Sequence, residues 1–253
     1  MRTEGLRQRK IIPQFRHFFD LSCIDYQYRI GEISTTIPPE IKDHIEGVLD
    51  TIFDPLPKHL NTHKTVKILF QTLAGFDPYT AWHSQENAEV SQILARECGI
   101  DDPRMLLNLR RAAMLHDIGK IGILNALDQP AKPGISLEFR MLHAYFTQYI
   151  LKKFPSLAEI EPISSAVHVK KTGKSYPADL SWDTIPFEAK ILAVADALHS
   201  ITHERPGDGA KSRDDALKIL RKYGYDQDIV DTLEKILPQI PQRLIPDVKS
   251  NGS

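Results

Sequence analysis

Two adjacent residues near the middle of the chain, His116 and Asp117, interrupt an apolar pattern. They follow the run Ala112-Ala-Met-Leu115 and precede Ile118-Gly119. Burying a carboxylate without a partner costs on the order of several kcal/mol, so a bound cation would account for Asp117. One imidazole and one carboxylate suit Fe, Mn, Zn or a similar metal better than Ca. Taken alone, however, the pair is better explained by a helix end at which Asp117 faces water.

The same feature recurs further along the chain. Asp196 lies inside the apolar run Ile191-Leu-Ala-Val-Ala-Asp-Ala-Leu198, so its carboxylate must be neutralised, paired or coordinated. Three more histidines precede or lie within apolar helical patterns, namely His83, His143 and His168. Each of them singly is explained by a hydrogen-bonded core or surface histidine. Four histidines and two aspartates in the order H, HD, H, H, D together favour a shared metal site.

The elements that would position these residues are helices. Apolar residues recur at helical spacing between short connections marked by Pro and Gly, which predicts an all-α chain. The expected helices run from Pro38 to Phe53, through Val66 to Gly75, from Ser84 to Gly99, from Pro103 to Gly119, and over 137–154, 160–168, 186–202, 214–223 and 226–237. The last two have capping side chains at Ser212 and Asp226.

The pattern divides the chain into three regions. Residues 1–62 form a mainly helical N-terminal extension of unknown role, 63–240 hold the motifs, and 241–253 form a flexible tail. A short β-hairpin is one interpretation of residues 20–37, where apolar residues alternate with polar ones. The alternating residues are Ile24, Tyr26, Tyr28 and Ile30. Dimerisation or regulation are the roles that such an extension suggests.

Composition limits the class of protein. The chain has 253 residues, of which 42% are hydrophobic and 26% charged, close to the averages of soluble globular domains. Lys plus Arg (32) balance Asp plus Glu (33), so no overall field favours DNA or an anionic membrane. The sequence lacks an apolar membrane span and a signal-peptide pattern. With Cys23 and Cys98 far apart and expected to be reduced, we expect a cytoplasmic protein.

Several ordered motifs resemble those of a known family. They are Asp77-Pro-Tyr-Thr-Ala-Trp-His-Ser84, Leu115-His-Asp-Ile-Gly-Lys-Ile-Gly122, His143 followed by Ile150-Leu151, Ser175-Tyr-Pro177, Ile191-Leu-Ala-Val-Ala-Asp-Ala197 and Arg205-Pro206. On these residues, the chain resembles the HD superfamily of metal-dependent phosphohydrolases over about 77–220. It is most similar to the HD-GYP branch, whose members typically hydrolyse the bacterial messenger cyclic di-GMP. The resemblance implies a bacterial signalling hydrolase built as an HD-domain helical bundle, with 63–240 as its catalytic domain.

The resemblance also implies roles for individual residues. A first divalent metal ion would be held by His83, His116, Asp117 and Asp196. Asp117 would bridge to a second ion, which is held also by His143 and His168. Fe or Mn is favoured, and Zn, Mg or Ni suits the same ligands. The ions would activate a water for attack on a phosphodiester. Catalysis would involve Asp117 and Lys120, and the substrate would be contacted by Lys120, Tyr176 and Arg205.

Departures from the family pattern leave the activity open. Val167-His168-Val169 stands where the family has two adjacent histidines and a Glu, so one expected ligand of the second metal is missing. Ser175 replaces the first residue of Gly-Tyr-Pro, and Asp208 follows Arg205-Pro206, where basic residues are usual. Tyr79 occupies the position of an additional Glu ligand in some members. One or two metal ions are therefore expected rather than three.

Three functions are compatible with this sequence. The first is a phosphodiesterase that opens a cyclic dinucleotide, with cyclic di-GMP favoured, to the linear dinucleotide. The second is an inactive relative that binds a nucleotide or a partner signalling domain such as a cyclase. The third is a single-metal HD phosphohydrolase that acts on another phosphoester. A homodimer is compatible with all three.

Overall fold

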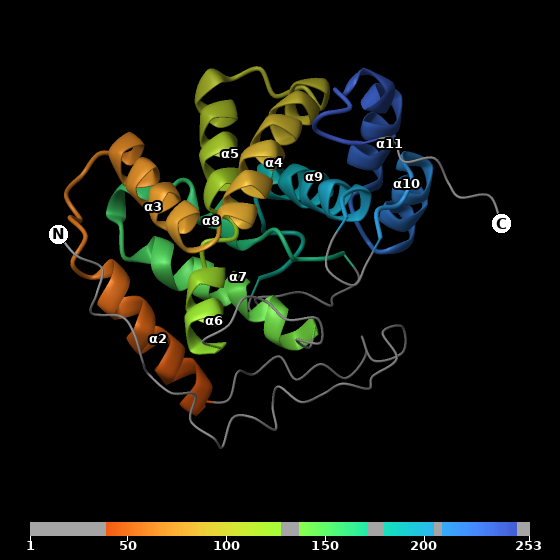
Figure 1. Cartoon of the computed structure of the whole chain (residues 1–253). Coiled ribbons are helices and arrows are strands. Elements are labelled where there is room, and N and C mark those ends of the chain that lie inside the picture. The colour runs from red at the N-terminus through yellow and green to blue at the C-terminus, as the bar shows by residue number, and fades with distance from the viewer. Residues whose placement is uncertain (1–38, 128–136, 172–179, 205–208, 247–253) are drawn as a thin grey trace.

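The computed structural model describes residues 39–127, 137–171, 180–204 and 209–246 of the chain (Figure 1). Within these ranges the regular structure is helical, and no strand occurs there. The all-α prediction is confirmed. The hairpin interpretation concerns residues 20–37, which lie outside the described ranges.

The described ranges contain ten α-helices. They are α2 (Pro39–Phe53), α3 (Thr62–Phe76), α4 (Pro78–Glu97), α5 (Pro103–Leu115), α6 (Lys120–Leu127), α7 (Leu137–Lys152), α8 (Glu161–Ser165), α9 (Phe187–Thr202), α10 (Arg213–Lys222) and α11 (Gln227–Ile236). Two short 3-10 helices are η2 (Pro155–Leu157) and η3 (Leu237–Gln239). The caps expected at Ser212 and Asp226 are present, since each side chain accepts a hydrogen bond from the first turn of its helix.

Helix α4 begins earlier than the sequence predicts, at Pro78 rather than near Ser84. Its cap is Asp77, whose carboxylate accepts a hydrogen bond from the Thr80 amide at 3.0 Å. Proline suits the first helical position because its missing N–H would have no partner there in any case. Because of this early start, His83 lies inside the helix, about two turns after the Asp77 cap, and not ahead of the helix.

Helix α5 ends earlier than predicted, at Leu115 rather than at Gly119. Residues 116–119 form turns that lead into α6, with the Lys120 amide donating to the Asp117 carbonyl at 3.0 Å. Apolar periodicity misses this end because the corner is itself buried, so apolar residues continue through it. The corner between α5 and α6 therefore holds the His-Asp pair at the centre of the bundle.

The core of the bundle is formed by α4, α5 and α9, with α4 packed along both of the others. Helices α10 and α11 cover one end of this core, and α2 lies across α6 and α7 at the other (Figure 1). Among the helices of the described ranges, none has both the length and the apolarity that a membrane crossing requires.

Helix α2 is part of the core rather than an appendage. Its residues Ile45, Leu49 and Phe53 are fully buried. A Cβ atom built on Gly122 would lie 2.7 Å from Cγ2 of Ile45 and 3.1 Å from Cδ2 of Leu49. The second glycine of the His116–Gly122 motif is therefore needed for α2 to approach α6 this closely.

Candidate metal centre

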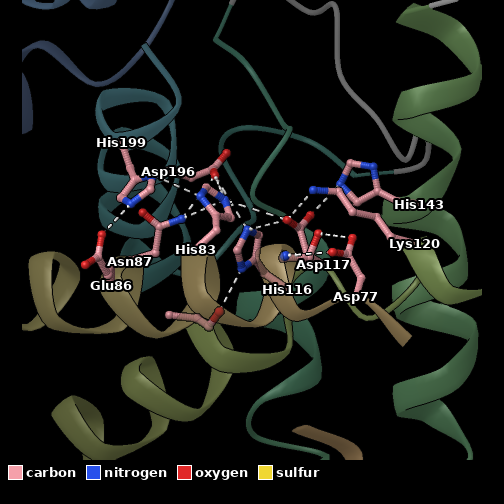
Figure 2. Close-up of polar contacts among 12 residues, drawn as sticks. Asp77, His83, Glu86, Asn87, His116, Asp117, Lys120, His143, Asp196 and His199 are labelled. Atoms are coloured by element: carbon pink, nitrogen blue, oxygen red, sulfur yellow. Dashed lines mark hydrogen bonds and ion pairs between the residues drawn. The ribbon is translucent and has the colours of Figure 1, made fainter. Parts of the chain in front are cut away.

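The six predicted ligands converge from α4, α7, α9, the turn after α8 and the corner between α5 and α6. Figure 2 labels His83, His116, Asp117, His143 and Asp196. They form two groups, in each of which one donor atom per residue lies within 4.8 Å of the others. The first group consists of His83, His116 and Asp196. The second consists of Asp117, His143 and His168.

Asp117 belongs to the second group but also faces the first. Its Oδ2 is 3.4 Å from Nε2 of His116 and 3.7 Å from Nε2 of His83, both in the first group. Its Oδ1 is 3.1 Å from Nε2 of His143, in the second group. One carboxylate thus directs one oxygen to each group, which is the arrangement that a carboxylate bridging two cations requires.

The positions of the protons on the His116 ring show whether the first group could accommodate a cation. Its Nδ1 lies 2.7 Å from the carbonyl oxygen of Ala113, which can only accept, so Nδ1 holds the proton of the neutral ring. The lone pair at Nε2 then faces Oδ2 of Asp117 at 3.4 Å and Oδ1 of Asp196 at 3.5 Å. This buried nitrogen has no hydrogen-bond partner in the part of the chain that the structure describes. A cation among these atoms would remove the repulsion, so the residues fit a metal ion.

The pKa values agree with a site that binds a cation. Burial would lower the pKa of His116, but the charges of Asp117 and Asp196 raise it to about 8, so without a metal ion Nε2 takes up a proton in the position that a cation would occupy. Burial would raise the pKa of Asp117, but His116 and Lys120 hold it well below its ordinary value. Burial lowers the pKa of His168 well below its ordinary value, so this imidazole is neutral and able to coordinate.

Lys120, at the start of α6, forms an ion pair with Oδ2 of Asp117. Its side chain is 35% exposed, so the ammonium lies at the edge of the site rather than beneath it. Tyr176 and Arg205, the other predicted substrate contacts, lie outside the described residues. Val167 and Val169, on either side of His168, are buried apolar core residues. The second group therefore has two imidazoles and one carboxylate.

Sequence reasoning missed a polar layer behind His83. The Asn87 side-chain amide lies 3.0 Å from Nε2 of His83 and donates to Oδ1 of Asp196 at 3.2 Å. A third set with the same donor spacing as the two groups above consists of Glu86, His199 and His203. Helical spacing from known ligands could have found these residues, since Asn87 follows His83 by four and His199 follows Asp196 by three.

Fold and site together define a helical domain with two adjacent, buried sets of imidazole and carboxylate donors. The chain belongs to the HD domain family, which matches residues 67–229. The resemblance drawn from the motifs is thereby confirmed. HD domains bind divalent metal ions, and the two groups are sets of donors that could hold such ions.

Individual relatives are similar to parts of the chain. The 3'3'-cGAMP-specific phosphodiesterase 3 of Vibrio cholerae is 36% identical over 170 residues, 65% of this chain and 36% of that protein. A cyclic di-GMP phosphodiesterase of Thermotoga maritima is 28% identical over 173 residues, 65% of this chain and 46% of that protein. The chain thus spans less than half the length of these two relatives.

One solved structure supports the fold. The protein Bd1817, described as a HDG"Y"P protein from Bdellovibrio bacteriovorus, superposes with a TM-score of 0.53 at 18% sequence identity. The superposition covers 88% of this chain and 76% of that one. At this identity, the likeness concerns the helical architecture alone, and it agrees with the predicted HD-domain bundle.

Proposed function

We propose that this domain is a metal-dependent phosphodiesterase that hydrolyses a cyclic dinucleotide, with cyclic di-GMP as the favoured substrate. The observation that carries the proposal is the position of Asp117, with Oδ1 3.1 Å from His143 and Oδ2 3.4 Å from His116. The substrate class is supported by the names of the relatives, one specific for 3'3'-cGAMP and another for cyclic di-GMP.

The two groups would hold two divalent ions joined by Asp117. The donors to the first would be His83, His116, Asp117 and Asp196, and those to the second Asp117, His143 and His168. Bound ions of this kind supply Lewis acidity and a water that is acidic enough to attack a phosphodiester near neutral pH. Because the second group supplies only three protein donors, an ion held there would keep coordination free for water or substrate. Fe or Mn stays the favoured metal, and Zn, Mg or Ni fits the same donors.

Lys120 would change partners when the site is loaded. Its ammonium pairs with Oδ2 of Asp117, the oxygen that faces the first group. If Asp117 coordinated an ion through that oxygen, Lys120 would lose its partner, and its 35% exposed side chain could turn to another anion. A phosphate oxygen of the substrate is then its natural partner, because a partly buried ammonium stabilises developing negative charge on a phosphoryl group.

The test combines metal analysis with turnover. Protein purified without chelators should contain two transition-metal ions per chain and convert cyclic di-GMP to the linear dinucleotide. His116→Ala and Asp117→Ala should each reduce turnover by about a hundredfold or more, because they remove several kcal/mol of charge stabilisation. The matched controls are His63→Ala and Asp101→Ala, which change exposed residues of the same types. Equal activity in all four variants would contradict the proposal.

Two observations favour specific alternatives, which the same assay decides. The relative specific for 3'3'-cGAMP makes that nucleotide the second candidate substrate, so both cyclic dinucleotides are assayed side by side. The apolar burial of Val167 and Val169 favours a single-metal phosphohydrolase or an inactive nucleotide-binding domain. One ion per chain, with turnover of other phosphoesters or with binding alone, would identify these cases. A partner signalling domain, a homodimer and a cytoplasmic location remain predictions.

A further inference from the structure

On the side of His83 that faces away from the metal groups, a line of hydrogen bonds leads to a carboxylate (Figure 2). Nδ1 of His83 lies 3.0 Å from Nδ1 of His199. Nε2 of His199 lies 2.9 Å from Oε2 of Glu86. Both imidazoles are buried, with 3% of His83 and none of His199 exposed, so water does not replace these contacts.

When a metal ion occupies the first group, the chemistry of the three groups fixes where the protons lie. An ionised carboxylate only accepts, so Glu86 requires the proton of His199 at Nε2. Nδ1 of a neutral His199 then has a lone pair and accepts the hydrogen bond from Nδ1 of His83. His83 in turn has its proton at Nδ1 and a lone pair at Nε2. Without an ion, the same nitrogen is placed to donate to Oδ1 of Asp196 at 3.0 Å, so a bound ion would take the position of that proton.

We infer that Glu86 and His199 are positioning residues that fix the tautomer in which His83 presents a lone pair to the first metal ion. The inference rests on the proposed metal site and deepens it. A carboxylate behind a metal-bound imidazole orients the ring and increases the basicity of the coordinating nitrogen. Here the carboxylate of Glu86 acts through the imidazole of His199. Glu86 and His83 both lie on α4, and His199 on α9 connects them.

The neighbours of His199 hold its ring in the required plane. His203 stacks on it with ring centroids 3.7 Å apart and an angle of 10° between the planes. Trp82 meets the same ring edge-on at 5.3 Å. Nδ1 of His203 lies 2.9 Å from the carbonyl oxygen of His199, which fixes the stacked ring to the backbone of α9.

The proton positions also decide whether the set Glu86, His199 and His203 can bind a third metal ion. A third metal ion there would take the lone pair of Nε2 of His199. His199 would then need its proton at Nδ1, facing Nδ1 of His83, and His83 would have to give up its own proton there. The lone pair of His83 at the first metal group would be lost. While His83 coordinates the first ion, this set therefore fixes the proton position of His83 and does not bind a third ion.

The test uses the full chain stripped of metal, with Zn²⁺ alone as the probe. Glu86→Gln keeps the shape but removes the charge, and its amide can donate to His199 and reverse both tautomers. His199→Phe keeps the stacked ring without its nitrogens. The matched control is Glu89→Gln, one turn along α4, whose carboxylate pairs with Arg243 at 2.7 Å on the surface. We expect Zn²⁺ binding about tenfold weaker for Glu86→Gln and about ten- to a hundredfold weaker for His199→Phe. Glu89→Gln should bind as the unaltered chain does.

A second readout does not depend on activity. Nitrogen-15 spectra of the histidine rings in the unaltered Zn²⁺-loaded chain should show His199 neutral, with its proton at Nε2. Coordination of Zn²⁺ by His199, a doubly protonated His199, or equal Zn²⁺ affinity in Glu86→Gln, His199→Phe and the control would overturn the inference. If a variant fails to fold by circular dichroism, the spectrum of the unaltered chain decides.

These readouts separate the inference from the proposed function. If the variants rank in Zn²⁺ affinity as expected but the unaltered chain opens no cyclic dinucleotide, the proposed activity is refuted. The inference that Glu86 acts on His83 through His199 is then upheld. A chain that binds no Zn²⁺ refutes the metal-dependent function. In that case the metal-free spectrum decides whether Glu86 acts on His199: a proton at Nε2 of His199 upholds the inference, and an unprotonated Nε2 overturns it.

Discussion

Gly119 and His143 are in direct backbone contact across the junction between the α5–α6 corner and α7. A Cβ atom built on Gly119 would lie 2.1 Å from the carbonyl oxygen of His143 and 2.5 Å from the amide nitrogen of Thr147. These are helix backbone atoms, which cannot rotate away as a side chain can. The glycine therefore sets the distance between the corner that bears Asp117 and the helix that bears a ligand of the second group.

Gly119→Ala should separate the two halves of the site. Helix α7 must shift to admit the methyl group, and such overpacking costs about 1–3 kcal/mol of unfolding free energy. The shift moves His143 away from Asp117, so the metal content should fall from two ions to one. Denaturant unfolding and elemental analysis measure the two effects. Gly47→Ala is the control, because nothing lies within 4 Å of a Cβ there and the helix should gain up to about 1 kcal/mol. Equal stability and metal content in both variants would contradict this account.

A buried hydroxyl joins the corner to α7. Oγ1 of Thr147 accepts a hydrogen bond from the Gly119 amide at 3.0 Å and donates to the His116 carbonyl at 2.9 Å. Thr147→Val keeps the volume but leaves a buried donor and a buried acceptor without partners. We expect a loss of about 2–6 kcal/mol, since each of the two groups costs about 1–3 kcal/mol. Thr147→Ser retains the hydroxyl and should lose about 1 kcal/mol for its methyl group. Thermal unfolding that ranks serine below valine would refute the role of the hydroxyl.

The residues of the two groups could be picked out from the sequence because each is a polar residue that interrupts an apolar helical pattern. Burial of Asp117 and Asp196 without a cation would be too costly, and sequence alone shows this cost. The sequence does not show which oxygen faces which imidazole. That depends on the α5–α6 corner, which ends a helix where the apolar pattern continues and which relies on the contact of Gly119 with α7.

The polar contacts of His83 with Glu86 and His199 could be predicted only in part. Helical spacing places His199 one turn after Asp196, but Glu86 lies among polar residues, with no apolar run around the carboxylate to mark it as buried. They meet only because α4 crosses α9 at that point, and a crossing angle is a property of packing between helices. Spacing along each helix suggests the face, but not the partner helix.

Asp50 links stability to pH through the contact between α2 and α7. Its Oδ1 accepts from Nζ of Lys153 at 2.7 Å and from the Tyr149 hydroxyl at 2.8 Å. Burial would raise the pKa of Asp50, but Lys153 and Tyr149 lower it below its ordinary value. A lowered folded-state pKa contributes stability above the unfolded pKa, near 4, and this contribution is lost as pH falls through the folded value.

Asp50→Asn should therefore cost stability at pH 7 and progressively less below about pH 4. The side chain of Asp50 is 40% exposed, so solvent screening limits the cost at pH 7 to less than about 1 kcal/mol. Denaturant unfolding of both proteins from pH 7 to pH 3 measures the difference. Asp43→Asn, an exposed change on the same helix, should show no such trend. A difference that grows toward low pH would reverse the sign and exclude this account.

Lys120 should separate metal binding from turnover. Lys120→Met removes the partner of Asp117 but none of the six imidazole and carboxylate donors, so the protein should keep its metal ions. Turnover should fall by about a hundredfold or more, with the change in kcat rather than KM, because a charge that meets the phosphoryl group mainly in the transition state is lost. Lys64→Met, at an exposed position on α3, is the matched control. If Lys120→Met lost its metal together with its activity, the ion pair would be needed to hold the Asp117 carboxylate in place for both groups. Lys120 would then be a support for Asp117 and not a partner of the substrate.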